Sequence, residues 1–335
     1  MPRRRLFALL AAVAALLIPA LGPSTYVMGI IARIALYAML ALGLNVVVGF
    51  AGLLDIGYVA FFGIGSYVYA FLCSPHFGLH MPFIVAVFAA ASVTAVFGVL
   101  IGAPTLRLRG DYLAIVTLGF GEIVYLLLIN LDRPVNITNG PSGIVTIDPP
   151  SMLGVTISTN AQYYYLFLFF LALVLLVSTR LRGSRIGWAW EAIREDELAA
   201  QAMGINTTVS KLQAFATGAC IAGVAGALLA CWQRSVFPDN FLFTESINVL
   251  AMVILGGMGS LPGVILGAAV IVALPEIFRP FALYRLLAFG LMLMLVMIFR
   301  PQGLLTFTPR RKLPEEPPAP GPAETDPVIA PGLPR

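Results

Sequence analysis

The feature that most constrains this chain is a series of long apolar runs that follow one another along the sequence. A membrane-spanning helix needs about 20 apolar residues to cross a hydrocarbon core of roughly 30 Å. The candidate runs are 6–22, 27–50, 53–73, 82–103, 112–131, 163–179, 212–232, 247–257, 264–278 and 283–299. Charged residues make up only 11% of the composition, against roughly 25% in soluble domains. The sequence therefore predicts an all-α polytopic membrane protein with about ten transmembrane helices.

The first run follows three arginines, Arg3 to Arg5, and has features of both a signal peptide and a membrane helix. It is longer than the 7–15 apolar residues typical of a signal peptide. The stretch from Ala20 to Gly22 is also a weak cleavage site. We expect an uncleaved first helix.

The Lys and Arg residues gather on one side of the predicted membrane. When ten spans alternate from a cytoplasmic N-terminus, fifteen of the twenty basic residues fall on the inner side. The other five are Arg133, Arg234, Arg279 and Arg285 on the outer side and Arg33 within a span. Because short cytoplasmic loops retain Lys and Arg, this bias predicts that both termini lie on the cytoplasmic side. A re-entrant hairpin would remove two spans without changing this orientation, so eight spans stay open.

The composition changes after Leu305. Residues 306–335 are rich in Pro and poor in large apolar side chains. Such a segment buries too little surface to offset its ordering entropy, so we expect a disordered cytoplasmic tail. Residues 1–305 then form one transmembrane domain.

Several classes of chemistry lack the residues they need. The basic residues form no stripe, so the net charge of +4 indicates membrane topology and lipid contact and no nucleic-acid partner. Three cysteines match neither a metal site nor a disulfide framework, and two histidines leave little for a catalytic set. The phosphate-binding pattern Gly-x-x-x-x-Gly-Lys-Ser/Thr does not occur. We expect no catalytic residue, metal or cofactor in this chain.

Two clusters of glycine interrupt apolar runs in opposite halves of the chain. In hydrocarbon every backbone polar group needs a partner, so a broken helix is tolerated only beside protein or a water-filled cavity. Paired interruptions of this kind indicate a transport path. Tight surface turns or close helix packing are the alternative interpretations. The glycines are Gly49, Gly52 and Gly57 in the first cluster and Gly256, Gly257, Gly259 and Gly263 in the second.

Two carboxylates lie inside apolar runs. Asp55 stands between Leu54 and Ile56, and Glu122 lies deeper in its run. A charge at such a position is expensive unless it faces a cavity, a cation or a helix N-terminus. Each residue therefore has either a pathway role or a structural one, as a helix cap or an ion pair. Arg33 is the candidate partner for one of them.

Residues 188–204 form the most informative polar segment on the inner side. Positions 188–203 are helix-forming and too charged to span a membrane, and Gly204 is placed to cap the end of the helix. Glu195, Asp196 and Glu197 make an acidic cluster that fits an anionic lipid surface poorly. We expect a cytoplasmic helix that docks on a soluble partner.

Five blocks of sequence carry a resemblance to a known family. They are LGLNVVVGFAGLLDIGYVAF at 42–61, LRLRGDYLAIVTLGFGEI at 106–123, NITNGPSGI at 136–144, AIREDELAAQAMGI at 192–205 and FRPQGLL at 299–305. Together they resemble the LivM-type permeases of high-affinity branched-chain amino-acid ABC transporters. The resemblance covers about residues 31–305.

The resemblance implies a permease subunit that translocates leucine, isoleucine and valine. It implies four kinds of partner chain: a second homologous permease, two cytoplasmic ATPase subunits that bind ATP and Mg, and an extracytoplasmic substrate-binding protein. It also implies a type II ABC importer fold and a coupling helix within 188–204 of the permease domain. The residues implied for coupling to the ATPase are Glu191, Ala192, Arg194, Glu195 and Gly204. Ile193 stands where the Glu-Ala-Ala loop of importer permeases has its second alanine.

A translocation pathway for an aliphatic zwitterion needs an apolar lining with a few polar groups. The candidates are Asn45, Asp55, Tyr58, Thr117 and Glu122. An ion-coupled secondary transporter is the alternative, because Asp55 and Glu122 are suited to titrate in a broken-helix site. A membrane enzyme is the third interpretation, and the residues favour it least.

Overall fold

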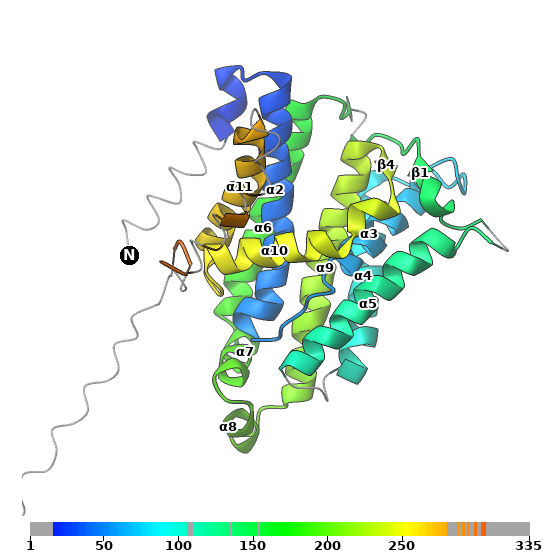
Figure 1. The fold of residues 1–335 in the computed structure, drawn as a ribbon. Coiled ribbons are helices and arrows are strands. Elements are labelled where there is room, and N and C mark those ends of the chain that lie inside the picture. The colour runs from blue at the N-terminus through cyan, green and yellow to red at the C-terminus, as the bar shows by residue number, and fades with distance from the viewer. Residues whose placement is uncertain are drawn as a thin grey trace, which may run out of the picture.

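A computed structural model describes residues 16–105, 110–133, 136–152, 155–279 and 303–305, with single positions between 287 and 299. These residues form a bundle of helices, as the apolar runs predict (Figure 1). The long helices are α2 (Thr25–Asn45), α4 (Phe83–Thr105), α5 (Asp111–Asn130), α6 (Asn160–Arg182) and α9 (Thr207–Gln233). The shorter helices are α3 (Val59–Leu72), α7 (Arg185–Glu195), α8 (Glu197–Ala202), α10 (Phe243–Gly256) and α11 (Leu261–Ile277).

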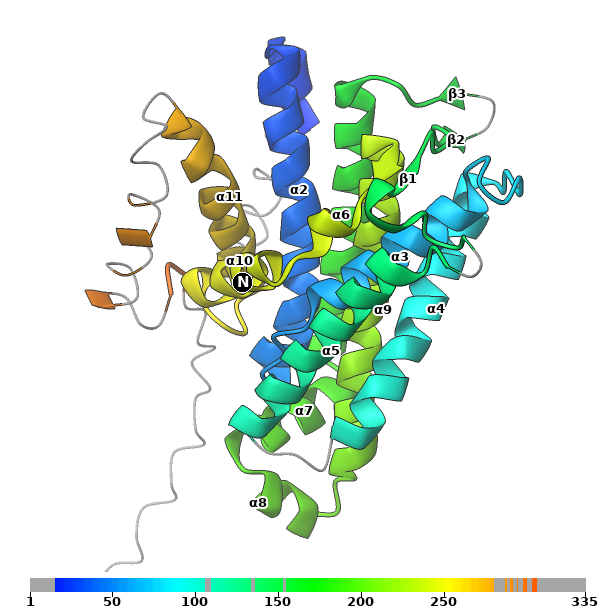
Figure 2. The same cartoon turned by 45° about the vertical axis from the view of Figure 1, so that its right-hand side comes forward.

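Small elements lie between the helices. Strand β1 (Ile144–Val145) pairs antiparallel with β4 (Ser235–Val236), and β2 (Ser151–Met152) pairs antiparallel with β3 (Val155–Thr156). A π-helix, η2 (Val46–Phe50), follows α2, and 3-10 turns form η1 (Ile18–Leu21), η3 (Gly140–Ser142) and η4 (Pro238–Phe241). The strands lie at one end of the bundle and α7 and α8 at the other (Figure 2). We call these the strand end and the α8 end.

Helix α9 forms the centre of the bundle, in contact with α2, α3 and α4. Its small residues allow this close packing. A Cβ atom at Gly223 would stand 2.6 Å from the Thr94 hydroxyl of α4, and one at Gly226 would overlap the Phe62 carbonyl of α3. Of the six candidate spans, the one that contains α9 is the most deeply buried.

The described residues do not confirm the expected count of about ten membrane spans. Among the described residues, six helical segments are long and apolar enough to cross a membrane, and the last of these joins η4 to α10. Helices α3 and α11 have 14 and 17 residues. At about 1.5 Å per residue they are shorter than a hydrocarbon core of roughly 30 Å. The glycine clusters explain why α3 and α11 are short, because they end helices inside apolar runs. Runs 6–22 and 283–299 fall largely outside the described residues.

Helices α10 and α11 leave the strand end and return to it. The end of α9 lies beside the start of α2, because Trp232 and the Thr25 carbonyl both hydrogen-bond to Asn160. Arg279, just after α11, donates to the Tyr26 hydroxyl at the same end of α2, over 2.6 Å. The turn between α10 and α11 lies at the opposite end of α2. Helix α10 runs across the long helices, and α11 runs alongside them (Figure 1).

Candidate functional site

The first glycine cluster lies where α2 breaks. The π-helix widens the last turn, so that the Ala51 N–H donates to the carbonyl of Val46, five residues earlier. Gly52 then takes a φ of +69°, which favours glycine. An irregular segment, 51–58, leads from there into α3. The break frees backbone carbonyls at the α8 end of the bundle.

The second glycine cluster forms the turn between α10 and α11. Gly257 and Gly259 have φ values of 105° and 83°, and Ser260 caps α11 by accepting from the Gly263 N–H. The backbones of Gly256 and Gly263 approach so closely that a Cβ on either would overlap the other residue. Residues 303–305 complete this turn, because the Leu304 N–H donates to the Leu255 carbonyl over 2.8 Å.

The two clusters meet, although more than 200 residues separate them in the sequence. The side-chain oxygen of Asn45, at the end of α2, accepts a hydrogen bond from the Gly259 N–H over 2.8 Å. Arg194 of α7 donates to the Gly49 carbonyl over 2.5 Å. A Cβ atom at Gly259 would stand 3.3 Å from the same guanidinium. We call Asn45, Gly49, Arg194 and Gly259 the junction.

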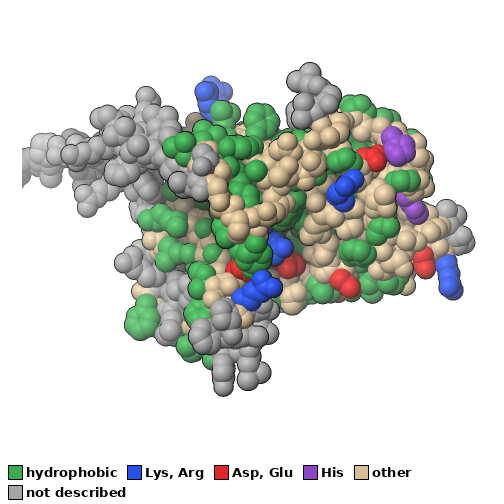
Figure 3. All heavy atoms as spheres, turned by 90° about the horizontal axis from the view of Figure 1, so that it is seen from above, with side chains coloured by type: hydrophobic (Ala, Val, Ile, Leu, Met, Phe, Trp, Pro, Cys, Tyr) green, Lys and Arg blue, Asp and Glu red, His purple; other side chains and the backbone are tan. Residues whose placement is uncertain are grey.

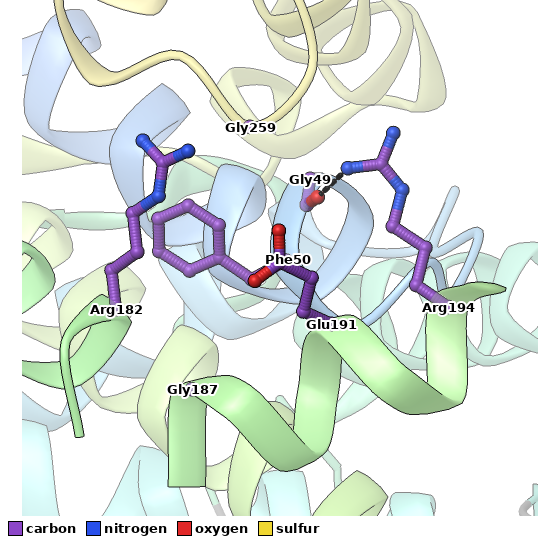
Figure 4. A pocket seen from close by; sticks show the side chains of 7 residues that line it. All are labelled: Gly49, Phe50, Arg182, Gly187, Glu191, Arg194 and Gly259. Carbon is purple, nitrogen blue, oxygen red and sulfur yellow. Dashed lines mark hydrogen bonds between the residues drawn. The ribbon is translucent and has the colours of Figure 1, made fainter. Parts of the chain in front are cut away.

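A small cavity of about 40 Å³ lies at the junction (Figure 4). The Glu191 carboxylate points into it, between the side chains of Arg182 and Arg194 (Figure 4). The Arg182 guanidinium lies 5.8 Å from the centre of the Phe50 ring. The lining residues are Gly49, Phe50, Arg182, Gly187, Glu191, Arg194 and Gly259. Both broken segments and α7 therefore share one contact region.

The expected single helix at 188–204 is two helices, α7 and α8. Asp196 separates them, because its backbone is extended, with φ −156° and ψ 112°. Its side chain caps α8 by accepting from the N–H groups of Leu198 and Ala199. Asp and Asn are favoured at this position because they satisfy the free N–H groups of a first turn. The expectation overlooked this cap inside the acidic cluster.

The position of Gly204 agrees with the expected helix end. Its φ is +86°, its N–H donates to the Gln201 carbonyl, and the Ile205 N–H donates to the Ala200 carbonyl. This pair of bonds is the Schellman motif that closes many helices. Ala192 is half-buried in α7, and Glu195 is exposed at its last position.

Two side-chain contacts attach α7 and α8 to the start of α9. Trp190 is fully buried and donates its indole N–H to the Ser210 carbonyl over 2.7 Å. Lys211 pairs with Glu197 over 2.5 Å, and the lysine side chain is only 6% exposed. Helix α7 is therefore in direct contact with both the junction and the central helix.

Four of the five candidate pathway residues lie around the entry to α3. Asp55 is buried and accepts from the Gly57 N–H over 3.1 Å. The Thr117 hydroxyl of α5 accepts from the Ile56 N–H, and the Tyr58 hydroxyl donates to the Gly218 carbonyl of α9. These contacts hold the irregular segment 51–58 between α5 and α9. Asn45 is the exception, because it belongs to the junction.

Glu122 is half-buried and borders a second cavity, of about 10 Å³. Gly57 and Ser246 line this cavity too, so it lies where α3, α5 and α10 meet. Gly57 packs so tightly on α5 that a Cβ atom would overlap the Thr117 carbonyl oxygen.

The expected pairing of Arg33 with Asp55 or Glu122 is wrong. The Arg33 guanidinium lies over the Trp232 ring, 6.0 Å from its centre, and its charge acts on Tyr37 and Glu245. Arg33 is in the strand half of α2, whereas Asp55 follows the other end of that helix. Charge alone cannot reveal this separation in sequence.

Several residues of the site were not among the candidates. Arg182 and Lys211 counted only as topology charges, and Phe50 and Trp190 only as parts of longer segments. The short spacing from Arg182 to Arg194 was the available signal, because it returns α7 to the end of α6. No sequence signal identified Ser246.

These observations define a multi-pass helical membrane protein with paired broken helices, an architecture found among transport proteins. Residues 26–300 match the family described as branched-chain amino acid transport system / permease component. The chain belongs to this family and is a permease component of a transport system.

Curated relatives agree with this assignment. The chain is 45% identical over 302 residues to the high-affinity branched-chain amino acid transport system permease protein LivM of Salmonella typhimurium, covering 83% of this chain and 70% of that protein. It is 32% identical over 287 residues to the permease protein BraD of Pseudomonas aeruginosa, covering 80% and 91%. It is 26% identical over 283 residues to the permease protein LivH of Escherichia coli, covering 80% and 91%. No solved structure matches the chain.

Proposed function

We propose that this chain is the membrane-spanning subunit of an ATP-driven importer that carries leucine, isoleucine and valine across a bacterial inner membrane. The names of the LivM and BraD relatives support the cargo. A substrate-binding protein outside the membrane delivers the amino acid and provides most of the selectivity. The chain itself provides the path and the mechanical link to the motor.

The junction is the observation that carries this proposal. Arg194 joins α7 to the broken end of α2, and Asn45 joins that end to the turn before α11. A push on α7 from a partner therefore reaches both broken segments at once. Glu191, Ala192, Arg194, Glu195 and Gly204 belong to this coupling segment, now divided into α7 and α8. Leu198 of α8 and Met203, the residue just after it, are 61% and 84% exposed, which suits them to a groove on a partner.

The partners follow from this arrangement. Two cytoplasmic ATPase subunits dock at the α8 end, and they bind the ATP and Mg. A second permease subunit, homologous to this chain, completes the path, and the likeness to both LivM and LivH supports such a pair. The binding protein docks at the strand end.

We propose eight spans in a type II ABC importer fold. Six of them contain α2, α3 together with the irregular segment 51–58 before it, α4, α5, α6 and α9. The first and last apolar runs provide the other two. Helices α10 and α11 form a re-entrant pair, because both lie between two contacts with the start of α2. Arg180, Arg182, Arg185 and Lys211 at the α8 end support a cytoplasmic location for that end and for both termini. Residues 1–305 form the permease domain, and 306–335 a cytoplasmic tail.

Asp55, Tyr58, Thr117 and Glu122 remain candidates for the path near the entry to α3. The glycines of the two clusters, Gly49, Gly52, Gly57, Gly256, Gly257, Gly259 and Gly263, allow the breaks and the close contacts between them.

Transport by reconstituted vesicles tests the proposal. Vesicles that hold both permease subunits and the ATPase subunits should accumulate leucine only with ATP inside and the binding protein outside. Vesicles that lack the ATPase subunits but carry a proton or sodium gradient should accumulate none. Uptake driven by the ion gradient alone would refute the proposal and favour a secondary transporter.

A further inference from the structure

A second polar cluster lies on α2 and α10, toward the strand end. Arg33 is eight residues after the start of α2, about 12 Å along the helix. Its side chain is exposed in this chain, although the helix is otherwise apolar enough to cross a membrane. A charge at such depth is strongly disfavoured against lipid, so it faces a polar partner or a water-filled path.

The neighbours of Arg33 carry the complementary charge. Tyr37, one turn further along α2, donates to the Glu245 carboxylate of α10 over 3.4 Å. Asn248, one turn after Glu245, lies within hydrogen-bonding reach of the same carboxylate. Arg33 and Tyr37 stand four residues apart on α2, so they share one face of that helix. A guanidinium, a carboxylate, a hydroxyl and an amide therefore converge from two helices.

Arg33 lies one turn before Tyr37, which binds Glu245, but Arg33 and Glu245 do not form an ion pair with each other. The ion pairs within 4.0 Å in the described part of the chain are His80–Asp148, Lys211–Glu197 and Arg279–Glu276. Figure 3 shows acidic and basic side chains together at a hollow near the middle of the face seen from above. Among the described residues, Arg33 thus has no carboxylate within ion-pairing distance.

We propose that Arg33 and Glu245 bind the two ends of the zwitterionic head group of the transported amino acid, an inference that rests on the proposed function. Arg33 receives the α-carboxylate, because a guanidinium binds a carboxylate with two parallel hydrogen bonds. Glu245, with Tyr37 and Asn248, receives the α-ammonium group. The Trp232 indole beside Arg33 provides an apolar surface for the aliphatic side chain.

The arrangement favours transient binding of the amino acid during transport over tight binding. Before the amino acid arrives, Arg33 and Glu245 compensate each other's charge. During passage each exchanges this partner for one end of the head group, so no charge is left uncompensated in the membrane. The site therefore distinguishes zwitterions from amines and from carboxylic acids, which have only one of the two charges.

Uptake by the whole assembly, with both permeases, the ATPase subunits and the binding protein in vesicles, tests this inference. The parent assembly must first accumulate leucine with ATP, and its failure would refute the proposed function alone. Arg33→Gln and Glu245→Gln should each lower the initial uptake rate at least tenfold, with unchanged leucine affinity of the binding protein. Arg33→Lys should retain an intermediate rate, because it keeps the charge without the two parallel bonds. Arg279→Gln, a matched arginine at the end of α11, should transport at close to the parental rate.

A second measurement remains available if the uptake variants assemble poorly. A thiol introduced by Arg33→Cys should react with a water-soluble maleimide added outside, and leucine-loaded binding protein with ATP should change that rate at least threefold. The introduced thiol of Arg279→Cys should react at a rate independent of leucine. Two results overturn the inference. One is uptake by both Gln variants at the parental rate, and the other is loss of the second permease on purification, which would identify the cluster as a subunit contact.

Discussion

Replacing Arg194 with alanine removes the direct bond between α7 and the broken end of α2. The guanidinium donates to the carbonyl of Gly49, a buried residue. A hydrogen bond with one charged partner contributes about 1.5–3 kcal/mol. About 1.4 kcal/mol corresponds to a tenfold change in an equilibrium constant. We therefore expect the equilibrium that couples α7 to α2 to weaken by roughly 10- to 100-fold.

The expected result is an assembly that hydrolyses ATP but transports poorly. Trp190 and the Lys211–Glu197 pair still attach α7 and α8 to α9, so the ATPase subunits should remain bound. The assay measures leucine uptake and ATP hydrolysis in the same vesicles. The ratio of leucine imported to ATP hydrolysed should fall about tenfold or more in Arg194→Ala.

Two variants serve as controls for this prediction. Arg185→Ala removes an exposed arginine from the first position of the same helix and should keep the parental ratio. Arg194→Lys should recover part of the ratio, because the ammonium reaches less far than the guanidinium. A parental ratio in Arg194→Ala would refute the coupling role of this bond. So would an equal loss in Arg185→Ala.

Three further changes test other contacts. Gly57→Ala should lower the free energy of unfolding by about 1–3 kcal/mol, because the new methyl group overlaps the Thr117 carbonyl. The loss should be measurable as a lower melting temperature in detergent. Gly119→Ala serves as the control and should not lower the melting temperature, because open space surrounds Gly119. Asn45→Ala leaves the Gly259 N–H without its acceptor and should lower both stability, by about 1–3 kcal/mol, and the uptake ratio. Lys211→Met should expose α8 to limited proteolysis, and adding Glu197→Gln should restore protection, because the double variant leaves no single charge behind.

The helical bundle follows from sequence because each long helix coincides with an apolar run. Hydrocarbon demands an internal partner for every backbone group, so a run of 20 apolar residues has few alternatives to a helix. The two glycine clusters were likewise visible as interruptions. Their effect on the number of membrane spans could not be predicted, because the lengths of α3 and α10 depend on where the chain resumes helical geometry after each break.

The contacts between distant segments could not be predicted from the sequence. Asp196 shows what local sequence cannot predict. An Asp inside a helical stretch is expected to be a surface charge, and only the structure shows that its backbone is extended. Arg33 shows the long-range limit, because Asp55, Glu122 and Glu245 are all carboxylates in apolar surroundings. Only the packing of α10 across α2 identifies Glu245 as the neighbour of Arg33.

The junction also explains why the two breaks occur where they do. A helix that ends inside a membrane protein leaves carbonyls without partners, and each needs a donor from elsewhere. At Gly49 that donor is Arg194, which comes from outside the long helices. At Gly259 the free N–H donates to the side-chain oxygen of Asn45. A movement of α7 therefore cannot leave the broken ends unchanged, because it must either carry Gly49 along or leave its carbonyl unpaired. In the proposed importer, the same backbone groups that make the breaks costly would thus make them responsive to an ATPase subunit that pushes on α7.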